Sequence, residues 1–151
     1  MTRHQSNSGF TLIELLVVMG VLGIIMSIAL ASYSSYIETA RGGTIKANFE
    51  IAVNTAKNNF AAARQLTAIG ASINSVIPAS SAGWADMMNT SGSQAPEGGD
   101  PFEPGLGNVT NGAVGVQYVG AWSNRDAEVI ITRPTYSGVP GASEIIRQAD
   151  Y

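Results

Sequence analysis

A run of apolar residues from Phe10 to Leu30 constrains this chain more than any other feature of its sequence. Glu14 is the only charged residue between Phe10 and Ile37. As a helix at about 1.5 Å per residue the run would be about 31 Å long, close to the roughly 30 Å of a bilayer core. Arg3 precedes the run, which favours a cytoplasmic N-terminus. The sequence therefore predicts a membrane-spanning helix near the start of the chain.

Three interpretations of this run are open. A secretory signal peptide is suggested by the A-x-A pattern of Ala29 and Ala31, but the run exceeds the usual ~7–15 apolar residues. A plain membrane anchor fits the length. It does not explain Glu14, because a charged carboxylate at mid-bilayer raises the free energy of insertion by roughly 2.5 kcal/mol or more. The cost is smaller near the headgroups. The third interpretation gives Glu14 a partner, because a carboxylate inside a membrane is first of all a hypothesis of a functional site.

Composition narrows the class of protein. The chain has 151 residues, enough for one domain and an appendage. Its 8 Lys and Arg against 11 Asp and Glu give a formal net charge of -3, which offers no support for general nucleic-acid binding. Cysteine is absent, so disulfides and thiolate chemistry are excluded.

The residues around the start of the apolar run form a recognisable pattern. A short polar segment ends in Gly9, Phe10 follows, and the letters TLIE place Glu14 four positions after Phe10. Followed by the long apolar run, this pattern closely resembles the N-terminus of type IV pilins and of the pseudopilins of type II secretion. The resemblance covers about residues 8–36.

The resemblance implies a processing step and a fold. A prepilin peptidase would cut between Gly9 and Phe10, and the new amine of Phe10 would be methylated. Residues 1–9 would be the leader, residues 10–36 the transmembrane and assembly helix, and residues 37–151 a globular head that includes the second half of the long helix. The expected fold is α+β and pilin-like, with the helix packed against a small antiparallel β-sheet.

The resemblance also implies the partner that Glu14 lacks. In such filaments the glutamate of one subunit pairs with the N-terminal amine of a neighbour. At ~4 Å and an effective dielectric constant near 20, the attraction is roughly 4 kcal/mol before desolvation. A buried ion pair is weak support for net stability, so we interpret the role of Glu14 as selecting the register between subunits.

One position departs from the family pattern. Relatives usually carry a helix-kinking proline that would fall on Ala31. Without proline the helix keeps its backbone N–H at this position and need not bend.

Beyond the apolar run a helical pattern continues. Apolar residues recur at spacings of three and four, and polar residues are expected on the other faces. The apolar positions are Ile45, Phe49, Ala52, Val53, Ala56, Phe60 and Ala63, and the polar ones are Lys46, Asn48, Glu50, Asn54, Lys57 and Asn58. We interpret the apolar stripe as packing against the head rather than as a partner site. Gly42-Gly43 is read as a weak point or bend in one long helix that ends near Ile69–Gly70.

The remainder of the chain is loop-rich with a few elements. AGWADMM predicts a short helical turn that buries Trp84 and Met88. AVGVQYVGAW and AEVIITR predict two strands, separated by SNRD as a hairpin loop. The tail ASEIIRQADY is compatible with either a closing strand or a short helix.

An acidic loop, EGGDPFEPG, presents Glu97, Asp100 and Glu103 between glycines and prolines. Oxygen ligands on a turn suit Ca²⁺, and the stretch resembles an Asp-Pro-aromatic segment near the calcium loop of major pseudopilins. The ligand set is incomplete, so a solvated acidic loop is the preferred interpretation, and no metal is assigned.

The sequence argues against an enzyme. Once the leader is removed, the chain has neither histidine nor cysteine, which excludes Ser-His-Asp triads, cysteine nucleophiles and typical zinc sites. It also has no GxxxxGK[ST] loop, so it is not its own assembly motor. We expect a non-enzyme with no cofactor.

The preferred function is a structural subunit of a type IV pilus, major or minor. The alternatives are a type II secretion pseudopilin and a minor or tip pilin that binds DNA or surfaces, although Arg125, Arg133 and Arg147 are too few to indicate a basic groove. Expected partners are other pilins, prepilin peptidase/methyltransferase, an inner-membrane assembly platform, and membrane lipid before assembly. The location would be the bacterial inner membrane with a cytoplasmic N-terminus, and then a surface pilus or a periplasmic pseudopilus.

The processing step gives a first testable prediction. Intact mass spectrometry of membrane material should show a chain that begins at Phe10 with a methylated amine, because Gly9 presents no side chain to the peptidase. A chain that begins at Ser32 would instead establish the signal-peptide interpretation and contradict the pilin one.

Overall fold

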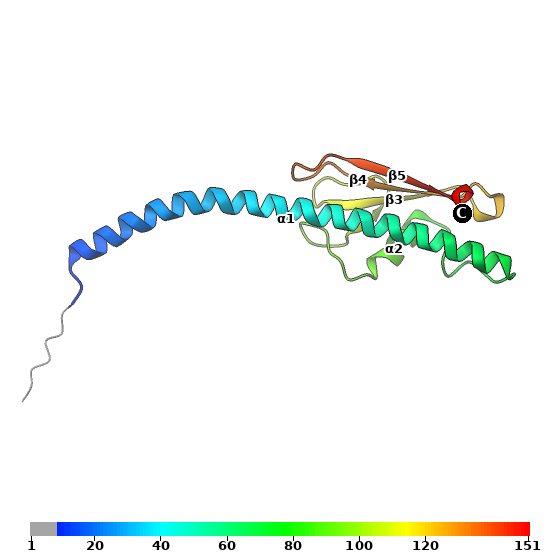
Figure 1. Cartoon of the computed structure of the whole chain (residues 1–151), viewed down its shortest axis with the longest axis horizontal. Helices are drawn as coiled ribbons and strands as arrows, with labels where there is room; N and C mark the ends of the chain where they lie inside the picture. The colour runs from blue at the N-terminus through cyan, green and yellow to red at the C-terminus, as the bar shows by residue number, and fades with distance from the viewer. Residues whose placement is uncertain (1–8) are drawn as a thin grey trace, which may run out of the picture. The chain divides into compact units, whose positions relative to one another are not determined.

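The structure is a computed structural model that describes residues 9–151, so most of the expected leader lies outside the described residues. The chain divides into two compact units, with the boundary between Ile37 and Glu38. Helix α1 (Leu12–Ala68) contributes its residues up to Ile37 to the first unit and the rest to the second. The second unit also contains the sheet and the shorter helices (Figure 1).

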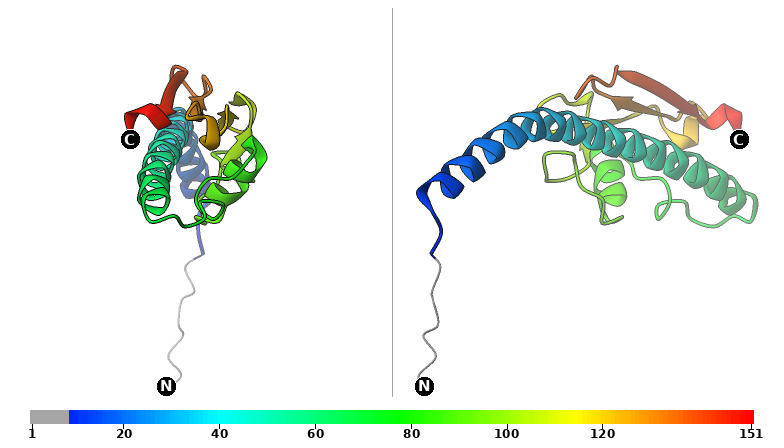
Figure 2. Two further views of the ribbon diagram at one scale, coloured as in Figure 1. Left: turned by 90° about the vertical axis from the view of Figure 1, so that its right-hand side faces the viewer. Right: turned by 60° about the vertical axis from the view of Figure 1, so that its left-hand side comes forward.

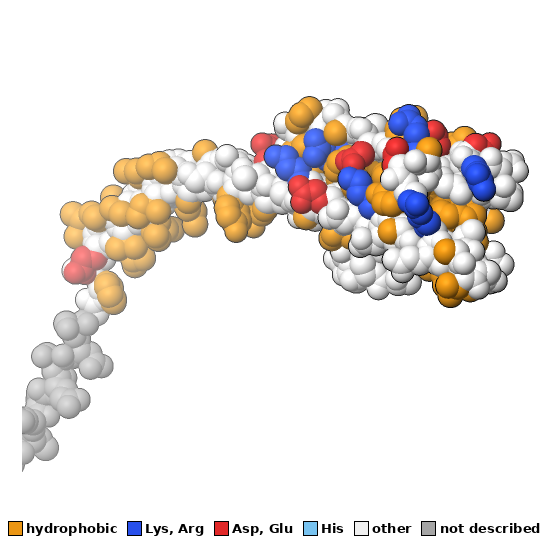
Figure 3. Space-filling view, turned by 45° about the vertical axis from the view of Figure 1, so that its right-hand side comes forward, with side chains coloured by type: hydrophobic (Ala, Val, Ile, Leu, Met, Phe, Trp, Pro, Cys, Tyr) orange, Lys and Arg blue, Asp and Glu red, His pale blue; other side chains and the backbone are white. Residues whose placement is uncertain are grey.

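Within the described part of the first unit, residues 12–37 form a helix with a largely apolar surface. Every residue from Gly9 to Tyr36 is exposed, and Figure 3 shows hydrophobic side chains gathered over the N-terminal part of this segment on the face in view. The segment is long and apolar enough to cross a membrane by length and composition. The helix runs through Ala31 without interruption, as the absence of proline allows.

Helix α1 ends where the sequence predicts. The N–H of Gly70 donates to the carbonyl of Thr67 at 3.1 Å, and the N–H of Ala71 donates to the carbonyl of Leu66 at 2.9 Å. Gly70 has a φ of 70°, which glycine adopts without the steric cost of a Cβ. This is the Schellman arrangement, which satisfies carbonyls of the last turn and stops the helix.

The apolar stripe on the second half of α1 packs inside its own unit, as predicted. The buried members of the stripe are Ile45, Ala52, Val53, Ala56, Phe60 and Ala63, with Phe49 partly buried. Residues three and four apart share one face of a helix, so a single side of α1 supplies about a third of the buried core residues. Figure 2, which looks along the helix in its left panel, shows the sheet and α2 gathered around part of its circumference.

Asn48 corrects the sequence analysis, which placed it on a solvent-facing side. It is only 3% exposed, because it lies three residues after Ile45 and four before Ala52, on the apolar stripe itself. Its Nδ2 donates to the carbonyl of Gln94 at 2.9 Å. A buried carboxamide is tolerated when it is hydrogen-bonded, so Asn48 fastens the loop around Gln94 to α1.

The sheet has five strands and is mostly antiparallel, which confirms an α+β fold. The strands are β1 (Phe102–Pro104), β2 (Gly107–Asn108), β3 (Ala113–Val119), β4 (Glu128–Arg133) and β5 (Ala142–Arg147). Their order is β1-β3-β4-β5, with β2 also paired to β3. The β3–β4 and β4–β5 pairs are antiparallel, and β4 aligns Val129 with Tyr118 and with Ile146. The predicted hairpin is therefore present.

Strand β1 pairs with β3 in parallel, which the sequence did not indicate. The N–H of Gly105 donates to the carbonyl of Val116 at 2.9 Å. The chain directly after β1 therefore lies against the backbone of β3. A Cβ at Gly115 would overlap the backbone of Gly105 and Gly107. The close approach of these two backbone segments therefore requires glycine at position 115.

The predicted helical turn is helix α2 (Ser81–Asn89), and it buries Trp84 and Met88 as expected. Its N-cap is Ser80, whose hydroxyl accepts from the N–H of Gly83 at 3.1 Å. The Trp84 ring meets the Phe60 ring edge-on at 6.0 Å between centroids. Helix α2 thus contributes its largest side chain to the same core as α1.

Two short 3₁₀ helices complete the fold. Helix η1 (Trp122–Asn124) lies in the connection between β3 and β4, and helix η2 (Gln148–Asp150) follows β5. The C-terminal tail is therefore both a strand and a short helix, the two alternatives that the sequence left open.

Gly42-Gly43 does not interrupt α1, which is continuous from Leu12 to Ala68. Gly42 is buried, and its neighbour in space is the turn that contains Val139. The hydroxyl of Ser137 in this turn donates to the carbonyl of Glu38 at 3.1 Å. Gly42 is thus a point of close contact between α1 and the loop before β5.

Replacing each glycine with alanine gives a matched test of this contact. A Cβ at Gly42 would lie 2.9 Å from Cγ2 of Val139, whereas a Cβ at Gly43 would meet nothing within 4 Å. Gly43→Ala should raise the free energy of unfolding by up to ~1 kcal/mol through helix propensity. Gly42→Ala should lower it by about 1 kcal/mol, because overpacking outweighs the same gain. Thermal unfolding of the two variants checks this, and equal stabilisation by both would refute the close contact.

Candidate functional site

The start of α1 is organised by Thr11 and Glu14. The N–H of Thr11 donates to Oε2 of Glu14 at 2.9 Å, and the hydroxyl of Thr11 donates to the same oxygen at 2.8 Å. In return, the N–H of Glu14 donates to the hydroxyl oxygen of Thr11 at 3.3 Å. This is a capping box, in which the first residues of a helix satisfy N–H groups that have no partner in the helix.

The capping box leaves one oxygen of Glu14 unused. Both donors from Thr11 reach Oε2, and Oε1 has no hydrogen-bond partner among residues 9–151. A carboxylate has about four acceptor positions, so Oε1 can accept a donor from outside this chain. The side chain is also exposed and held in one place by Thr11.

Sequence reasoning identified Glu14 but missed Thr11. The signal was available, because a T-x-x-E pattern directly before an apolar run is the sequence form of a capping box. The family resemblance and the charge of Glu14 carry no information on the hydrogen-bonding role of Thr11.

Gly9 and Phe10 lie just before the helix, in residues without regular secondary structure. Phe10 is 86% exposed, and nothing lies within 4 Å of a Cβ built on Gly9. The peptide bond between them is therefore outside the hydrogen-bonded helix. That position suits a bond that a peptidase must bind in an extended form.

The acidic loop does not gather its carboxylates. Glu97 forms an ion pair with Arg41 at 2.9 Å and accepts a hydrogen bond from the hydroxyl of Tyr136 at 2.8 Å. Asp100 is exposed, and Glu103 lies 3.5 Å from the side-chain amide of Asn108. Within residues 9–151 no three His, Cys, Asp or Glu side chains are arranged to hold a metal ion.

Glu97 instead joins two segments of the head. Burial of Tyr136 raises the pKa of its phenol, and the hydrogen bond to Glu97 raises the pKa further. The phenol therefore stays protonated and donates to Glu97 across the neutral pH range. The Arg41–Glu97–Tyr136 chain of contacts ties the acidic loop and the turn before β5 to helix α1.

The three arginines considered for nucleic-acid binding do not act together. Arg147 pairs with Glu128 at 2.8 Å. Arg133 donates to the carbonyl of Pro140 at 3.1 Å and lies over the ring of Phe49. Arg125 is exposed in the connection between β3 and β4. Two of the three are thus engaged inside the head.

Comparison with known proteins identifies the N-terminal segment. Residues 4–30 match the family model for the prokaryotic N-terminal methylation motif. The chain therefore carries the signature of the type IV pilins and pseudopilins, and the match includes Gly9, Phe10 and Glu14. No curated protein and no solved structure gave a significant match.

The capping box gives a prediction for Thr11. Thr11→Val removes the hydroxyl, and with it two of the three hydrogen bonds to Glu14, whereas Thr11→Ser keeps them. Loss of an N-cap costs about 1 kcal/mol. In detergent micelles, amide exchange at Leu15, whose N–H donates to the carbonyl of Thr11, should be about fivefold faster in Thr11→Val. Exchange in Thr11→Ser should stay near the unsubstituted rate. Equal rates in all three chains would rule out a capping role.

Proposed function

We propose that this protein is a structural subunit of a type IV pilus, major or minor, polymerised through the first half of α1. The observation that carries the proposal is the exposed apolar helix of residues 12–36 that begins with a carboxylate whose Oε1 is unpaired within residues 9–151. The methylation motif at residues 4–30 supports membership of the pilin or pseudopilin class.

The apolar surface requires a cover. Monomeric soluble proteins rarely expose contiguous apolar patches of more than a few hundred Å², and here about five turns of helix, residues 12–30, are apolar on nearly every side. A bilayer covers such a helix before assembly, because the backbone polar groups are satisfied within the helix. In a filament, the same surface is covered by the corresponding helices of neighbouring subunits.

Processing supplies the group that Glu14 is positioned to accept. Cleavage between Gly9 and Phe10 by a prepilin peptidase would release a cationic amine, which is then methylated. In the proposed filament the amine of one subunit donates to Oε1 of Glu14 in its neighbour, while Thr11 holds Oε2. The attraction of roughly 4 kcal/mol before desolvation acts at one position along an otherwise uniform apolar surface. It therefore selects the register between subunits.

The second unit would be the exposed head of the subunit. Its core is closed, since the apolar stripe of α1 is already buried against the sheet and α2. The head therefore needs no partner to cover that stripe. We assign the protein no catalytic role. Its proposed partners are other pilins, the processing enzyme and an inner-membrane assembly platform.

Substitution of Glu14 tests the proposed pairing. Glu14→Val should insert normally or more easily, because the charge cost of roughly 2.5 kcal/mol or more disappears. Cleavage after Gly9 should persist, and filament assembly should fail or slow sharply because the ion pair is lost. Glu14→Asp keeps the charge but shortens its reach, so assembly should be intermediate. Sheared surface filaments, quantified against membrane-bound subunit, provide the measurement.

Glu50→Gln is the matched control, because Glu50 is an exposed carboxylate on the second half of the same helix. It should assemble at the normal rate. A Glu14→Val chain that is cleaved, inserted and assembled as fast as this control would contradict the pairing role. A pseudopilin of type II secretion would share the Glu14 dependence but remain periplasmic, so absence from sheared surface filaments would favour that alternative.

A further inference from the structure

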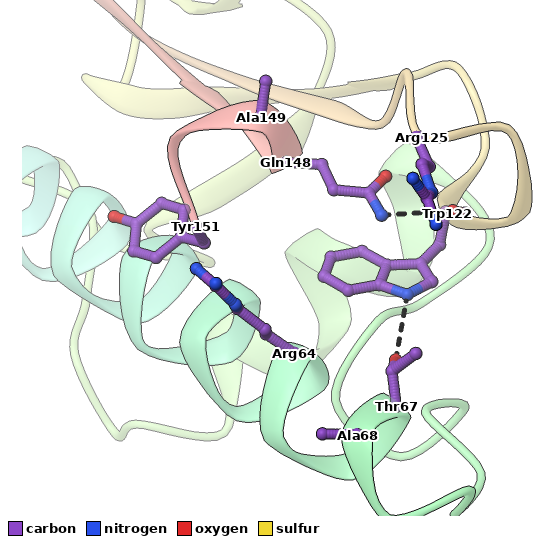
Figure 4. Close-up of a pocket in the computed structure, with 8 residues that line it drawn as sticks. All are labelled: Arg64, Thr67, Ala68, Trp122, Arg125, Gln148, Ala149 and Tyr151. Carbon is purple, nitrogen blue, oxygen red and sulfur yellow. Dashed lines mark hydrogen bonds between the residues drawn. The ribbon is translucent and has the colours of Figure 1, made fainter.

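An open hollow lies in the second unit where the end of α1 meets the two 3₁₀ helices. Its volume is about 630 Å³, within the range of small-molecule sites. The residues used below are Arg64, Thr67, Trp122, Arg125, Gln148 and Tyr151, all of which line it. Figure 4 shows Arg64 beside the ring of Tyr151, and Arg125 beyond the indole of Trp122.

Two cations of the head that have no partner line this hollow. Arg41, Lys57 and Arg147 each form an ion pair, and Arg133 donates to a backbone carbonyl. Within residues 9–151, the side chains of Lys46, Arg64 and Arg125 form neither an ion pair nor a hydrogen bond, and of these three the two arginines lie at the hollow. A guanidinium presents five N–H donors in a planar fork that matches a carboxylate. Two such donors are therefore available at one hollow.

The aromatic wall of the hollow is fixed in place. The indole N–H of Trp122 donates to the hydroxyl of Thr67 at 3.2 Å, and its carbonyl accepts from Nε2 of Gln148 at 3.2 Å. The Trp122 ring also packs on the Phe60 ring, with 5.7 Å between centroids. A held aromatic face loses little conformational freedom when a ligand ring lies against it.

One further feature indicates a ligand that carries hydroxyl groups. Oε1 of Gln148 is buried and has no hydrogen-bond partner within the described residues. A rotation of the Gln148 side chain toward the hollow would bring this oxygen to a hydroxyl donor, and the new hydrogen bond would be a net gain. Arg125 is placed at the rim by the end of η1, where its backbone N–H donates to the carbonyl of Trp122 at 3.2 Å.

The surrounding charge favours one anionic group over many. Asp126 directly follows Arg125, and Asp150 directly precedes Tyr151, and both acids are exposed. Each of these carboxylates belongs to a residue next in sequence to one that lines the hollow, so a polyanion long enough to extend past the hollow, such as a nucleic-acid strand, would meet repulsion as well as attraction.

We propose that this hollow binds an acidic sugar, a sugar ring that carries a single carboxylate. The carboxylate pairs with Arg64, the ring lies against Trp122, Arg125 donates to hydroxyl oxygens of the sugar, and Oε1 of Gln148 accepts from one of its hydroxyl groups. This proposal does not rest on the proposed function, because all of the residues that line the hollow belong to the second unit.

The test uses the full chain in detergent micelles, titrated with sodium glucuronate while tryptophan fluorescence is recorded. Trp84 is fully buried, so a change reports Trp122. We expect a saturable change in fluorescence with glucuronate. Uncharged glucose should bind with an affinity at least about tenfold lower. Arg64→Gln should weaken glucuronate binding by roughly tenfold or more, and Arg125→Gln should weaken it by a smaller factor.

Lys46→Gln is the matched control, because Lys46 is an exposed cation of the same helix that does not line the hollow. It should leave glucuronate binding unchanged. Equal losses in Lys46→Gln and Arg64→Gln would overturn the proposal, as would equal affinities for glucose and glucuronate. Tighter binding of inorganic phosphate or of a thymidine dinucleotide would overturn it in favour of a phosphate ligand. If Arg64→Gln fails to fold, the indole N–H resonance of Trp122 in the unsubstituted chain decides, and no shift with glucuronate overturns the proposal.

Discussion

The rest of this structure depends on one constraint. The apolar surface of the first half of α1 must be shielded from water by molecules other than its own chain. Each CH₂ group withdrawn from water contributes about 0.8 kcal/mol, and the residues from Phe10 to Tyr36 are exposed throughout. Lipid and neighbouring helices are the two covers that suit a surface that is apolar on all sides. In the filament that we propose, a single carboxylate at the start of that surface would decide how neighbouring helices align, because nonpolar contacts alone specify register weakly.

The same helix meets a different environment after Glu38. There the apolar residues narrow to one stripe, and the ring of Phe60 is surrounded by the rings of Trp84, Trp122 and Tyr151. A hydrogen bond and an ion pair also join α1 to other segments of the head. Asn48 holds the loop at Gln94, and the ion pair between Lys57 and Glu144 joins α1 to β5. The aromatic cluster also fixes Trp122, so the packing of the head and the shape of the hollow have a common origin.

Local patterns in the sequence predict most of the elements. The apolar period gives the stripe of α1, Gly70 marks its end, and the β-rich segments give β3 and β4. The misses have two kinds of cause. The parallel pairing of β1 depends on the crossing at Gly115, which involves segments distant in sequence, and the Gln94 carbonyl that satisfies the buried Asn48 is also distant. Thr11 and the place of Asn48 on the apolar stripe were within reach of sequence reasoning, since the residues that reveal them are three or four positions away. The residues of the hollow come from three distant segments and have no local signal.

The most direct test of the central claim is to detect the contact between Glu14 of one subunit and the amine of Phe10 of its neighbour. Filaments assembled from equal parts of ¹³C-labelled and ¹⁵N-labelled subunits would be studied by solid-state NMR, so that transfer reports only contacts between different chains. The account predicts transfer between the side-chain carboxyl carbon of Glu14 and the N-terminal nitrogen of Phe10, with nitrogen and oxygen within about 4 Å. Assembled filaments in which this transfer is absent, while contacts between neighbouring apolar side chains are present, would contradict it.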